Sequence, residues 1–282
     1  MQKKARLGQN FLVDAEAQRA IVEALGDVRQ ATVAEIGPGA AAITDLLAGR
    51  ARRVIAIELD RALAAALRTR FLLSNAEAGY ERVQVLEQDV LAVDLTALAA
   101  SLPVSDEGPG AGLAVVGNLP YYITSDILLH LFRHQAVLGR TVLMVQREVA
   151  DRMVAEPGGR EYGMLSASCQ LYARVERLFT LPPRAFSPPP QVHSSVVRLT
   201  FAPRFAELGV EPAAFLAHLR VCFAQKRKTL ANNLRAAGVA GAVVAEALAE
   251  AGIEAQARAE TLTLEEQARL FRALRLVPSR AQ

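Results

Sequence analysis

The segment TVAEIGPG, residues 32–39, decides the fold class of this chain of 282 residues. A run rich in β-branched and apolar residues ends at Ile36 and passes directly into Gly37, Pro38 and Gly39, and a helical pattern follows. Glycine permits a tight turn and lets the backbone approach a ligand closely. A strand that runs through such a turn into a helix predicts a nucleotide-binding α/β domain.

The first two-thirds of the chain repeats this alternation of strand and helix. Short β-branched runs are separated by stretches rich in Ala and Leu, which favours a parallel sheet covered by helices on both faces. Two last runs have little helix between them and suit an antiparallel hairpin that finishes the sheet, joined by a Pro-rich link. The predicted strands are 32–36, 54–58, 83–86, 113–116, 141–145, 174–180 and 194–201, and helical patterns cover 62–71 and 125–132.

The strand signal stops after residue 201, and three helices are expected from there on. The first is predicted to run from Pro212 to about residue 237, where Gly238 suits the end of a helix. The second covers 242–251, and the third follows the capping box that runs from Thr263 to Glu266. We therefore expect two domains: a Rossmann-like α/β domain over 1–201 and a helical domain over 202–282.

Composition excludes several classes of protein. Hydrophobic residues make up 52% of the chain, yet no apolar run reaches the length of a membrane span. The polar start MQKK is unlike an export signal, so a soluble cytoplasmic protein without membrane contact is expected. Cys169 and Cys222 lack metal-ligand spacing, and the four histidines form no cluster, so we infer no metal. No oligomeric interface is evident, which favours a monomer.

Positive charge is concentrated in the last third. From residue 180 onward there are 13 Arg and Lys against 8 Asp and Glu. The chain has only four lysines, Lys3 and Lys4 at the start and Lys226 and Lys228 near the end, where Arg227 lies between them and Arg220 is close. On a predicted helix such a run is usually a solvated face. A phosphate-binding patch is the alternative, because basic clusters bind nucleic-acid backbones.

A second segment, VVGNLPYY at residues 115–122, carries the chemistry. An apolar strand runs into Asn118, Leu119, Pro120 and Tyr121. Proline fixes its own φ and biases the preceding residue toward an extended conformation. The Asn118 amide and the Leu119 carbonyl are therefore expected to be presented together, where they can hold a planar amino group beside a stacking ring. An ordinary strand-to-loop turn is the plain alternative.

Two acidic residues follow two other predicted strands. Glu58 comes 19 residues after Gly39, where an acid that binds ribose hydroxyls is expected, and Asp89 can accept a hydrogen bond from an adenine amino group. Either acid could instead cap a helix. A dinucleotide is disfavoured because Ala42 takes the place of the third glycine and Pro38 lacks an amide hydrogen. A nucleoside ligand without phosphate, such as S-adenosylmethionine, fits these departures better.

With these motifs in place, nearly the whole chain resembles the bacterial small-subunit (16S) rRNA adenine dimethyltransferase family. The segments that carry the resemblance are GQNFL at 8–12, EIGPG at 35–39, NLPY at 118–121, QREVADR at 146–152, YGMLS at 162–166, AFSPPP at 185–190, SSVVRL at 194–199 and FAQKRKTL at 223–230, together with Glu58 and Asp89. It departs from the pattern at His193, where many relatives have Asp, and at Tyr122, where others have Asn or Gln. Any one segment alone would be weak evidence.

The resemblance implies a class I S-adenosylmethionine-dependent methyltransferase fold with a helical C-terminal RNA-binding domain. It implies dimethylation of N6 on two adjacent adenosines near the 3′ end of small-subunit rRNA, within an immature subunit during ribosome biogenesis. The expected cofactor-binding residues are Asn10, Leu12, Gly37, Gly39, Glu58, Asp89, Val90 and Asn118. The expected catalytic residues are Asn118, Leu119, Pro120, Tyr121 and Phe186, with Tyr121 and Phe186 on either side of a flipped adenine. The expected RNA-binding residues are Lys3, Lys4, Arg147, Arg220, Lys226, Arg227 and Lys228.

Three other functions stay open at this point. A methyltransferase of large-subunit (23S) rRNA would use the same chemistry with a different helical domain. An assembly factor could bind immature subunits with catalysis as a release signal. A DNA N6-adenine methyltransferase shares Asn-x-Pro-Tyr motifs, but the C-terminal domain is against it.

Overall fold

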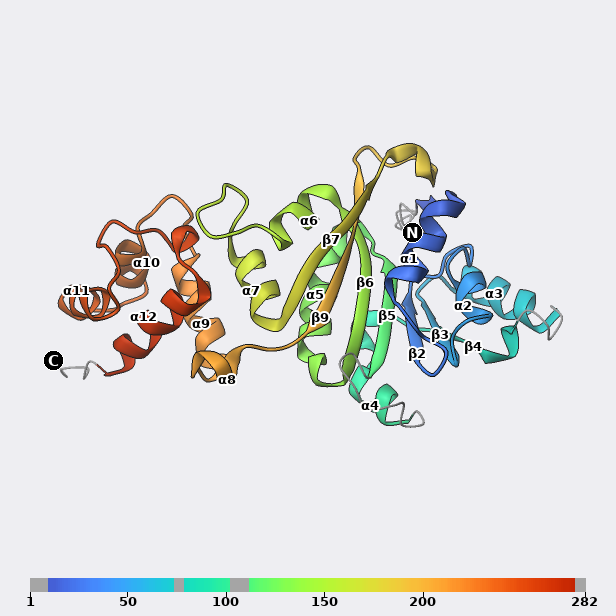
Figure 1. The fold of residues 1–282 in the computed structure, drawn as a ribbon, viewed down its shortest axis with the longest axis horizontal. Helices are drawn as coiled ribbons and strands as arrows, with labels where there is room; N and C mark the ends of the chain where they lie inside the picture. The colour runs from blue at the N-terminus through green and yellow to red at the C-terminus, as the bar shows by residue number, and fades with distance from the viewer. Residues whose placement is uncertain (1–9, 74–78, 102–111, 277–282) are drawn as a thin grey trace, which may run out of the picture. The chain divides into compact units, whose positions relative to one another are not determined.

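The computed structural model describes residues 10–73, 79–101 and 112–276, and its larger part is built on one mixed sheet (Figure 1). Seven strands lie in the order β4-β3-β2-β5-β6-β9-β7. Neighbours from β4 to β6 run parallel, and β9 is antiparallel to β6. The strands are β2 (Thr32–Ile36), β3 (Arg53–Glu58), β4 (Val83–Glu87), β5 (Leu113–Asn118), β6 (Leu138–Gln146), β7 (Ala173–Leu181) and β9 (Ser194–Phe201). The predicted α/β class and strand runs are confirmed.

The central strands form because their side chains are apolar on both sides. Every residue of β2 is buried, as are the five residues of β3 from Val54 on. Helices between the strands cover them: α1 (Ala15–Ala24), α2 (Thr44–Ala48), α3 (Arg61–Leu73), α4 (Leu95–Ala100) and α5 (Thr124–Arg133). Ile21 and Val22 of α1 belong to the same buried cluster as Val33 and Val142 of the sheet. This continuous apolar core fixes where each strand ends.

A second, two-stranded sheet was not predicted. β1 (Phe11–Leu12) pairs antiparallel with β8 (Phe186–Ser187), and the amide of Val13 donates to the Ala185 carbonyl at 2.9 Å. Each strand has only two residues, too short for a periodic signal in the sequence. The pairing holds the segment around Asn10 beside the Pro-rich link.

The remaining helices are α6 (Arg147–Met153), α7 (Met164–Tyr172), α8 (Phe205–Leu208), α9 (Pro212–Cys222), α10 (Leu230–Ala236), α11 (Gly241–Glu250) and α12 (Leu264–Leu276). The capping box is confirmed, since Thr263 Oγ1 accepts from the Glu266 amide at 3.2 Å and Glu266 Oε2 accepts from the Thr263 amide at 2.9 Å. None of the helices in the described ranges is long and apolar enough to cross a membrane.

The long helix predicted from Pro212 to residue 237 is wrong. It is two helices, α9 and α10, and the Lys/Arg run lies in the turn between them. Thr229 begins α10 as its N-cap, with Oγ1 accepting from the Asn232 amide at 3.3 Å. Asn233 closes the turn, because its Nδ2 donates to the carbonyls of Cys222 at 2.6 Å and Gln225 at 3.3 Å. These side-chain bonds compete with helix continuation.

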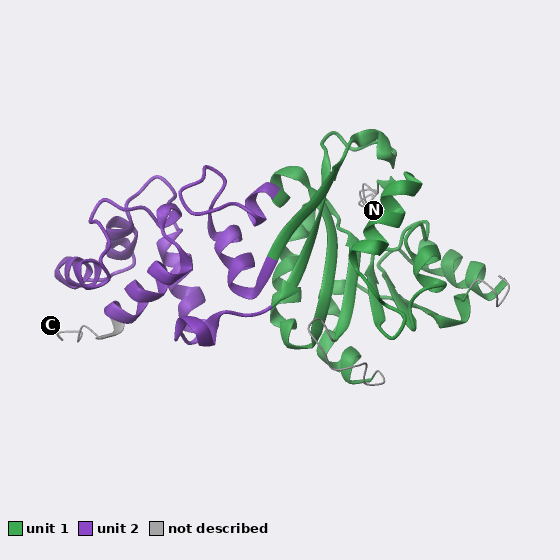
Figure 2. Cartoon of the chain, viewed as in Figure 1, with its two compact units in different colours: residues 1–150, 175–201 green, residues 151–174, 202–282 purple. Residues whose placement is uncertain are grey.

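The chain divides into two compact units (Figure 2). Unit 1 contains residues 1–150 and 175–201, and unit 2 contains residues 151–174 and 202–282. One unit boundary coincides with the domain boundary expected at 201 and 202, but residues 151–174 group with the helical unit rather than with the sheet. Within unit 2, Tyr162 and Leu171 are buried in one cluster with Phe215, Leu219 and Leu264.

Candidate functional site

A cavity of about 270 Å³ opens at the carboxyl ends of four neighbouring strands of unit 1. Its lining includes Ile36 at the end of β2, Glu58 at the end of β3, Asp89 just after β4 and Asn118 at the end of β5. The register aligns these ends, since Ile36 lies opposite both Ile57 and Gly117. Parallel α/β sheets bind ligands at this edge.

The glycine turn forms one wall of the cavity. Gly37 and Gly39 have φ values of 68° and 54°, which favour glycine over residues that carry a Cβ. The Gly37 amide donates to the Ile57 carbonyl at 3.0 Å, which ties the turn to β3. A Cβ at Gly39 would lie 2.9 Å from the Phe11 ring, so the turn and the N-terminal strand β1 pack in direct contact.

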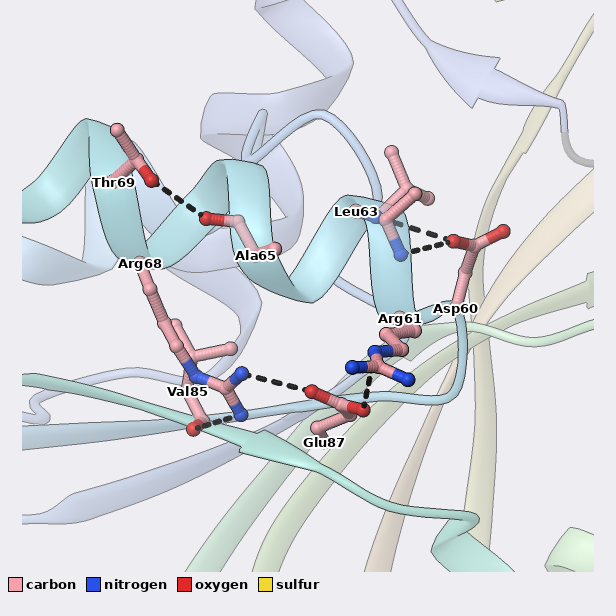
Figure 3. Close-up of polar contacts among 9 residues, drawn as sticks. Asp60, Arg61, Leu63, Ala65, Arg68, Thr69, Val85 and Glu87 are labelled. Atoms are coloured by element: carbon pink, nitrogen blue, oxygen red, sulfur yellow. Dashed lines mark hydrogen bonds and ion pairs between the residues drawn. The ribbon is translucent and has the colours of Figure 1, made fainter.

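Glu58 is buried at the end of β3 and is held by two backbone amides. Gly39 donates to its Oε2 at 3.2 Å and Asp60 donates to its Oε1 at 2.9 Å. Asp60 in turn caps α3, with Oδ1 accepting from the amides of Ala62 and Leu63, as Figure 3 shows. The Glu58 carboxylate is therefore fixed toward the cavity by the turn before it and the helix after it.

The next strand is secured to the same helix. Glu87, the last residue of β4, pairs with Arg68 at 2.8 Å and with Arg61 at 4.0 Å, and both arginines lie on α3 (Figure 3). Arg68 also donates to the Val85 carbonyl at 3.4 Å. The side chains are exposed, so the pairs contribute little to stability. The parallel pairing of β3 with β4, in which Glu58 lies opposite Glu87, places the end of β4, and with it Asp89, beside Glu58.

Asp89 caps a helix, one of the two roles that the sequence left open, and it also lines the cavity. The Asp89 side-chain oxygen Oδ1 accepts a hydrogen bond from the Leu91 amide at 2.9 Å and so caps the short 3-10 helix Val90–Ala92. Val90 lines the same wall and is buried.

Asn118 is oriented by a contact that joins distant parts of the chain. Its Nδ2 donates to the Asn10 carbonyl at 2.9 Å, across a sequence separation of 108 residues. Its Oδ1 accepts no hydrogen bond from the described residues. The Leu119 amide donates to the Met144 carbonyl at 3.0 Å and the Pro120 carbonyl accepts from Thr124 Oγ1 at 3.0 Å. The described part of the chain therefore leaves the Asn118 side-chain oxygen and the Leu119 carbonyl as acceptors in this loop.

The two rings expected to sandwich a base are not placed alike. Tyr121 lines the cavity, and its hydroxyl is 2.7 Å from Ser194 Oγ on β9, which fixes the ring. Phe186 lies in β8, is only 3% exposed and is not part of the cavity lining. Its ring packs in the core cluster that also contains Leu12 of β1. The structure therefore brings Tyr121 to the site and keeps Phe186 in the buried apolar core of unit 1.

Glu35 was not among the expected site residues, although it lies in the quoted motif. It is buried in β2, lines the cavity, and accepts a hydrogen bond from Thr44 Oγ1 at 2.6 Å. Burial, reinforced by the neighbouring acids Asp45 and Glu58, raises the pKa of Glu35 to about 7. An acid within an otherwise uncharged predicted strand, two residues before Gly37, is the sequence signal that could have identified it. Leu59, next to Glu58, and Tyr122 also line the cavity without having been expected.

The expected RNA-binding residues lie in separate places. Lys3 and Lys4 lie outside the described residues. Arg147 is exposed at the start of α6, and its amide donates to the His193 carbonyl at 3.0 Å. In unit 2, Arg220 is exposed near the end of α9, and Lys226, Arg227 and Lys228 are exposed in the turn before α10. Lys226 Nζ donates to the Arg160 carbonyl at 2.8 Å, so this lysine also has a structural contact.

Comparison with known proteins gives consistent similarities. A model of the family described as ribosomal RNA adenine dimethylase matches residues 1–275. The chain is 59% identical over 271 residues to the ribosomal RNA small subunit methyltransferase A of Acidobacterium capsulatum, covering 96% of this chain and 91% of that protein. A solved dimethyladenosine transferase from Plasmodium falciparum has a TM-score of 0.75 at 23% identity and covers 92% of this chain and 95% of its own. The 23S rRNA methyltransferase ErmE has a TM-score of 0.68 at 26% identity, covering 94% and 100%.

Proposed function

Because this chain belongs to the ribosomal RNA adenine dimethylase family, we propose that the cavity described above is its active site. There the enzyme dimethylates N6 of two adjacent adenosines near the 3′ end of small-subunit rRNA. The resemblance noted from the motifs is confirmed, and the chain is an S-adenosylmethionine-dependent rRNA adenine dimethyltransferase. The observation that supports the site assignment best is the Asn118 amide: this residue lines the cavity, its nitrogen donates to the Asn10 carbonyl, and its oxygen accepts no hydrogen bond from the described residues.

The residues of the cavity fit S-adenosylmethionine. Three acids, Glu35, Glu58 and Asp89, line it, and no Lys, Arg or His is among the lining residues that the structure describes. Such a lining suits a cationic nucleoside and opposes the pyrophosphate of a dinucleotide. Glu58 would hold the ribose hydroxyls, and Asp89 with Val90 would hold the adenine ring. When bound, the cofactor supplies a methyl group already activated by its sulfonium.

The protein's part in the chemistry is positioning. The amino group of adenine is a poor nucleophile because its lone pair is delocalised into the ring. Asn118 Oδ1 and the Leu119 carbonyl each accept a hydrogen bond from one of the two N–H groups of the adenine amino group. These two bonds favour a pyramidal nitrogen whose lone pair faces the cavity. No protein base is needed, because the nitrogen becomes strongly acidic on methylation and loses its proton to water.

The target base must leave its stack to reach this loop, which costs a few kcal/mol. Stacking on Tyr121 offsets part of that cost, since base–aromatic stacking contributes about 1–3 kcal/mol. The hydroxyl contact with Ser194 holds the ring in place before RNA arrives. Phe186 can stack on the other face of the flipped adenine only if its ring leaves the buried core cluster in which it packs.

We further propose that the substrate is the rRNA of an immature small subunit, met in the cytoplasm by a monomeric enzyme. The basic turn at Lys226, Arg227 and Lys228 contributes contacts to phosphate. A 23S rRNA substrate is the weaker candidate, because identity to ErmE is 26% whereas identity to the small-subunit relative is 59%. A binding role in assembly is compatible with catalysis.

The test is incubation with small subunits that lack these methyl groups, using cofactor labelled in its methyl group. Mapping of the modified bases is expected to show two dimethylated adjacent adenosines near the 3′ end of the rRNA. Incorporation into large subunits instead, or none into either, would contradict the proposal.

A further inference from the structure

Tyr122 presents a large ring to solvent at the rim of the cavity. It is 63% exposed and lines the cavity together with Leu59, which is 50% exposed. The two side chains come from different elements, Leu59 from the turn after β3 and Tyr122 from the 3-10 turn Tyr121–Ile123. A large exposed apolar surface beside a functional cavity marks a binding surface more often than a single exposed residue elsewhere does.

No hydrogen bond or ring contact from the described part of the protein engages the Tyr122 ring. The neighbouring Tyr121 is held by Ser194, whereas Tyr122 has neither a hydrogen bond nor a ring contact among the described residues. The 3-10 turn that carries it is fixed by the Ile123 amide, which donates to the Pro120 carbonyl at 3.2 Å. The backbone of this turn is therefore fixed, while the Tyr122 ring has no hydrogen-bond or ring partner among the described residues.

Charge near Tyr122 decides what can cover it. Asp126 is exposed in the first turn of α5, and three acids but no Lys, Arg or His are among the described residues that line the cavity. Negative charge here disfavours a phosphate group. The uncharged face of a nucleobase is compatible with it, and every base has such a face.

Resting on the function proposed above, we propose that Tyr122 is the stacking platform for the nucleotide next to the target adenosine. When the target adenosine is flipped into the cavity, its neighbour loses a stacking partner and exposes one face. Tyr122 follows Tyr121 in the same turn, so the two rings receive consecutive nucleotides, the target on Tyr121 and its neighbour on Tyr122. Leu59, the other large apolar side chain exposed among the cavity-lining residues, offers the neighbour a further apolar contact.

The first test measures initial rates on unmethylated small subunits. Tyr122→Ala is expected to lower kcat/KM for the subunit about 5- to 100-fold, the effect of losing one base–aromatic stack. Tyr122→Phe keeps the ring and is expected to stay within about twofold of the wild type, and affinity for S-adenosylmethionine is expected to be unchanged in both. Leu129→Ala, a 45% exposed residue of α5 outside the cavity lining, is the matched control.

The second test observes the stack directly. The chain contains no tryptophan, so Tyr122→Trp places a single indole at the rim. With protein-free, unmodified small-subunit rRNA as the probe, its emission is expected to be quenched on binding, whereas Leu129→Trp keeps its emission. Binding is verified at the same concentrations by gel shift.

The outcomes separate the two proposals. If the wild type does not methylate unmodified small subunits, the proposed function fails. If it does and Tyr122→Ala is equally active, only the stacking role fails. The stacking role also fails if Tyr122→Ala loses cofactor affinity, or if the Tyr122→Trp variant binds RNA with unchanged emission.

Discussion

Within the described residues, the side-chain amide of Asn118 is oriented by one hydrogen bond, in which its Nδ2 donates to the Asn10 carbonyl at 2.9 Å. That contact leaves the oxygen as an acceptor, which is the orientation that the target amino group requires. If the Asn118 amide were turned round, its Nδ2 would face the amino group of the target adenine, and two hydrogen-bond donors would meet. In the proposed mechanism, the segment around Asn10 would therefore act by setting which way this amide faces.

Asn118→Ala should lower kcat about 10²- to 10³-fold, the usual cost of removing one preorganised hydrogen-bonding group from a transition state. The measurement is methyl incorporation at saturating cofactor. Asn232→Ala, which removes an exposed amide on α10, serves as the control. An unchanged turnover number for Asn118→Ala would show that this amide has no catalytic role.

Glu35 makes the stability of the protein depend on pH. Because burial raises its pKa from 4.5 to about 7, the folded state binds a proton that the unfolded state has lost. Its stabilising contribution is fully present below about pH 4.5 and is lost as pH rises through about 7. A shift of this size corresponds to about 3 kcal/mol.

Glu35→Gln should remove this dependence while keeping an oxygen for the Thr44 hydroxyl to donate to. Relative to the wild type, the variant is expected to gain stability between pH 5 and pH 8. Urea unfolding at several pH values measures it. Parallel pH curves for the two proteins would mean that Glu35 is already ionised when the protein is folded.

At the residue scale, the sequence predicted those cavity-lining residues that lie at or just after the end of a strand. Glu58, Asp89 and Asn118 were identified in this way, because parallel strands end at one edge. The Asn10–Asn118 contact could not be predicted, since no local pattern links residues so far apart. Phe186 was expected in the site from the resemblance, and its burial depends on the β1–β8 pairing.

At the scale of the elements, the turn between α9 and α10 carries the exposed residues Lys226, Arg227 and Lys228. The Lys/Arg run interrupts what looked like one helix, because Thr229 and Asn233 offer the backbone other partners. Helical periodicity alone could not show this. Lys226 also binds the Arg160 carbonyl, so Arg227 and Lys228 are the cleaner pair for a test of charge.

Replacing Arg227 and Lys228 with Gln should weaken RNA binding and flatten its dependence on salt. Each lost phosphate contact reduces the slope of log K against log salt by about 0.7–0.9. Filter binding to unmodified small-subunit rRNA at several salt concentrations measures it. Replacing Arg50 and Arg52, exposed arginines just before β3, is the matched control. An unaltered slope would identify the turn as a solvated surface.

The whole molecule is divided by packing rather than by chain order. The sequence placed the helical domain after residue 201 because strand patterns end there, and that position coincides with a unit boundary. It could not show that residues 151–174 belong with the helices, since α7 lies between two strands of the sheet. Only the buried contacts of that segment reveal its membership.

Those contacts predict that residues 202–282 do not fold stably alone. Tyr162, Ala167 and Leu171 are fully buried against Phe215 and its neighbours in unit 2. Removing a large buried side chain costs about 2–5 kcal/mol, so losing Tyr162 and Leu171 together costs about 4–10 kcal/mol, which is comparable with the whole stability of an ordinary domain, about 5–15 kcal/mol.

A fragment of residues 202–282 should therefore lack a cooperative thermal transition, and one that joins 151–174 to 202–282 by a glycine–serine linker should regain it. Circular dichroism melts of the two fragments make the comparison. Replacing Tyr162 and Leu171 with Ala in the linked fragment should abolish the gain, which separates packing from mere length. If the shorter fragment melted cooperatively at the same temperature as the linked one, residues 151–174 would be an attachment to the helical unit and no part of its core.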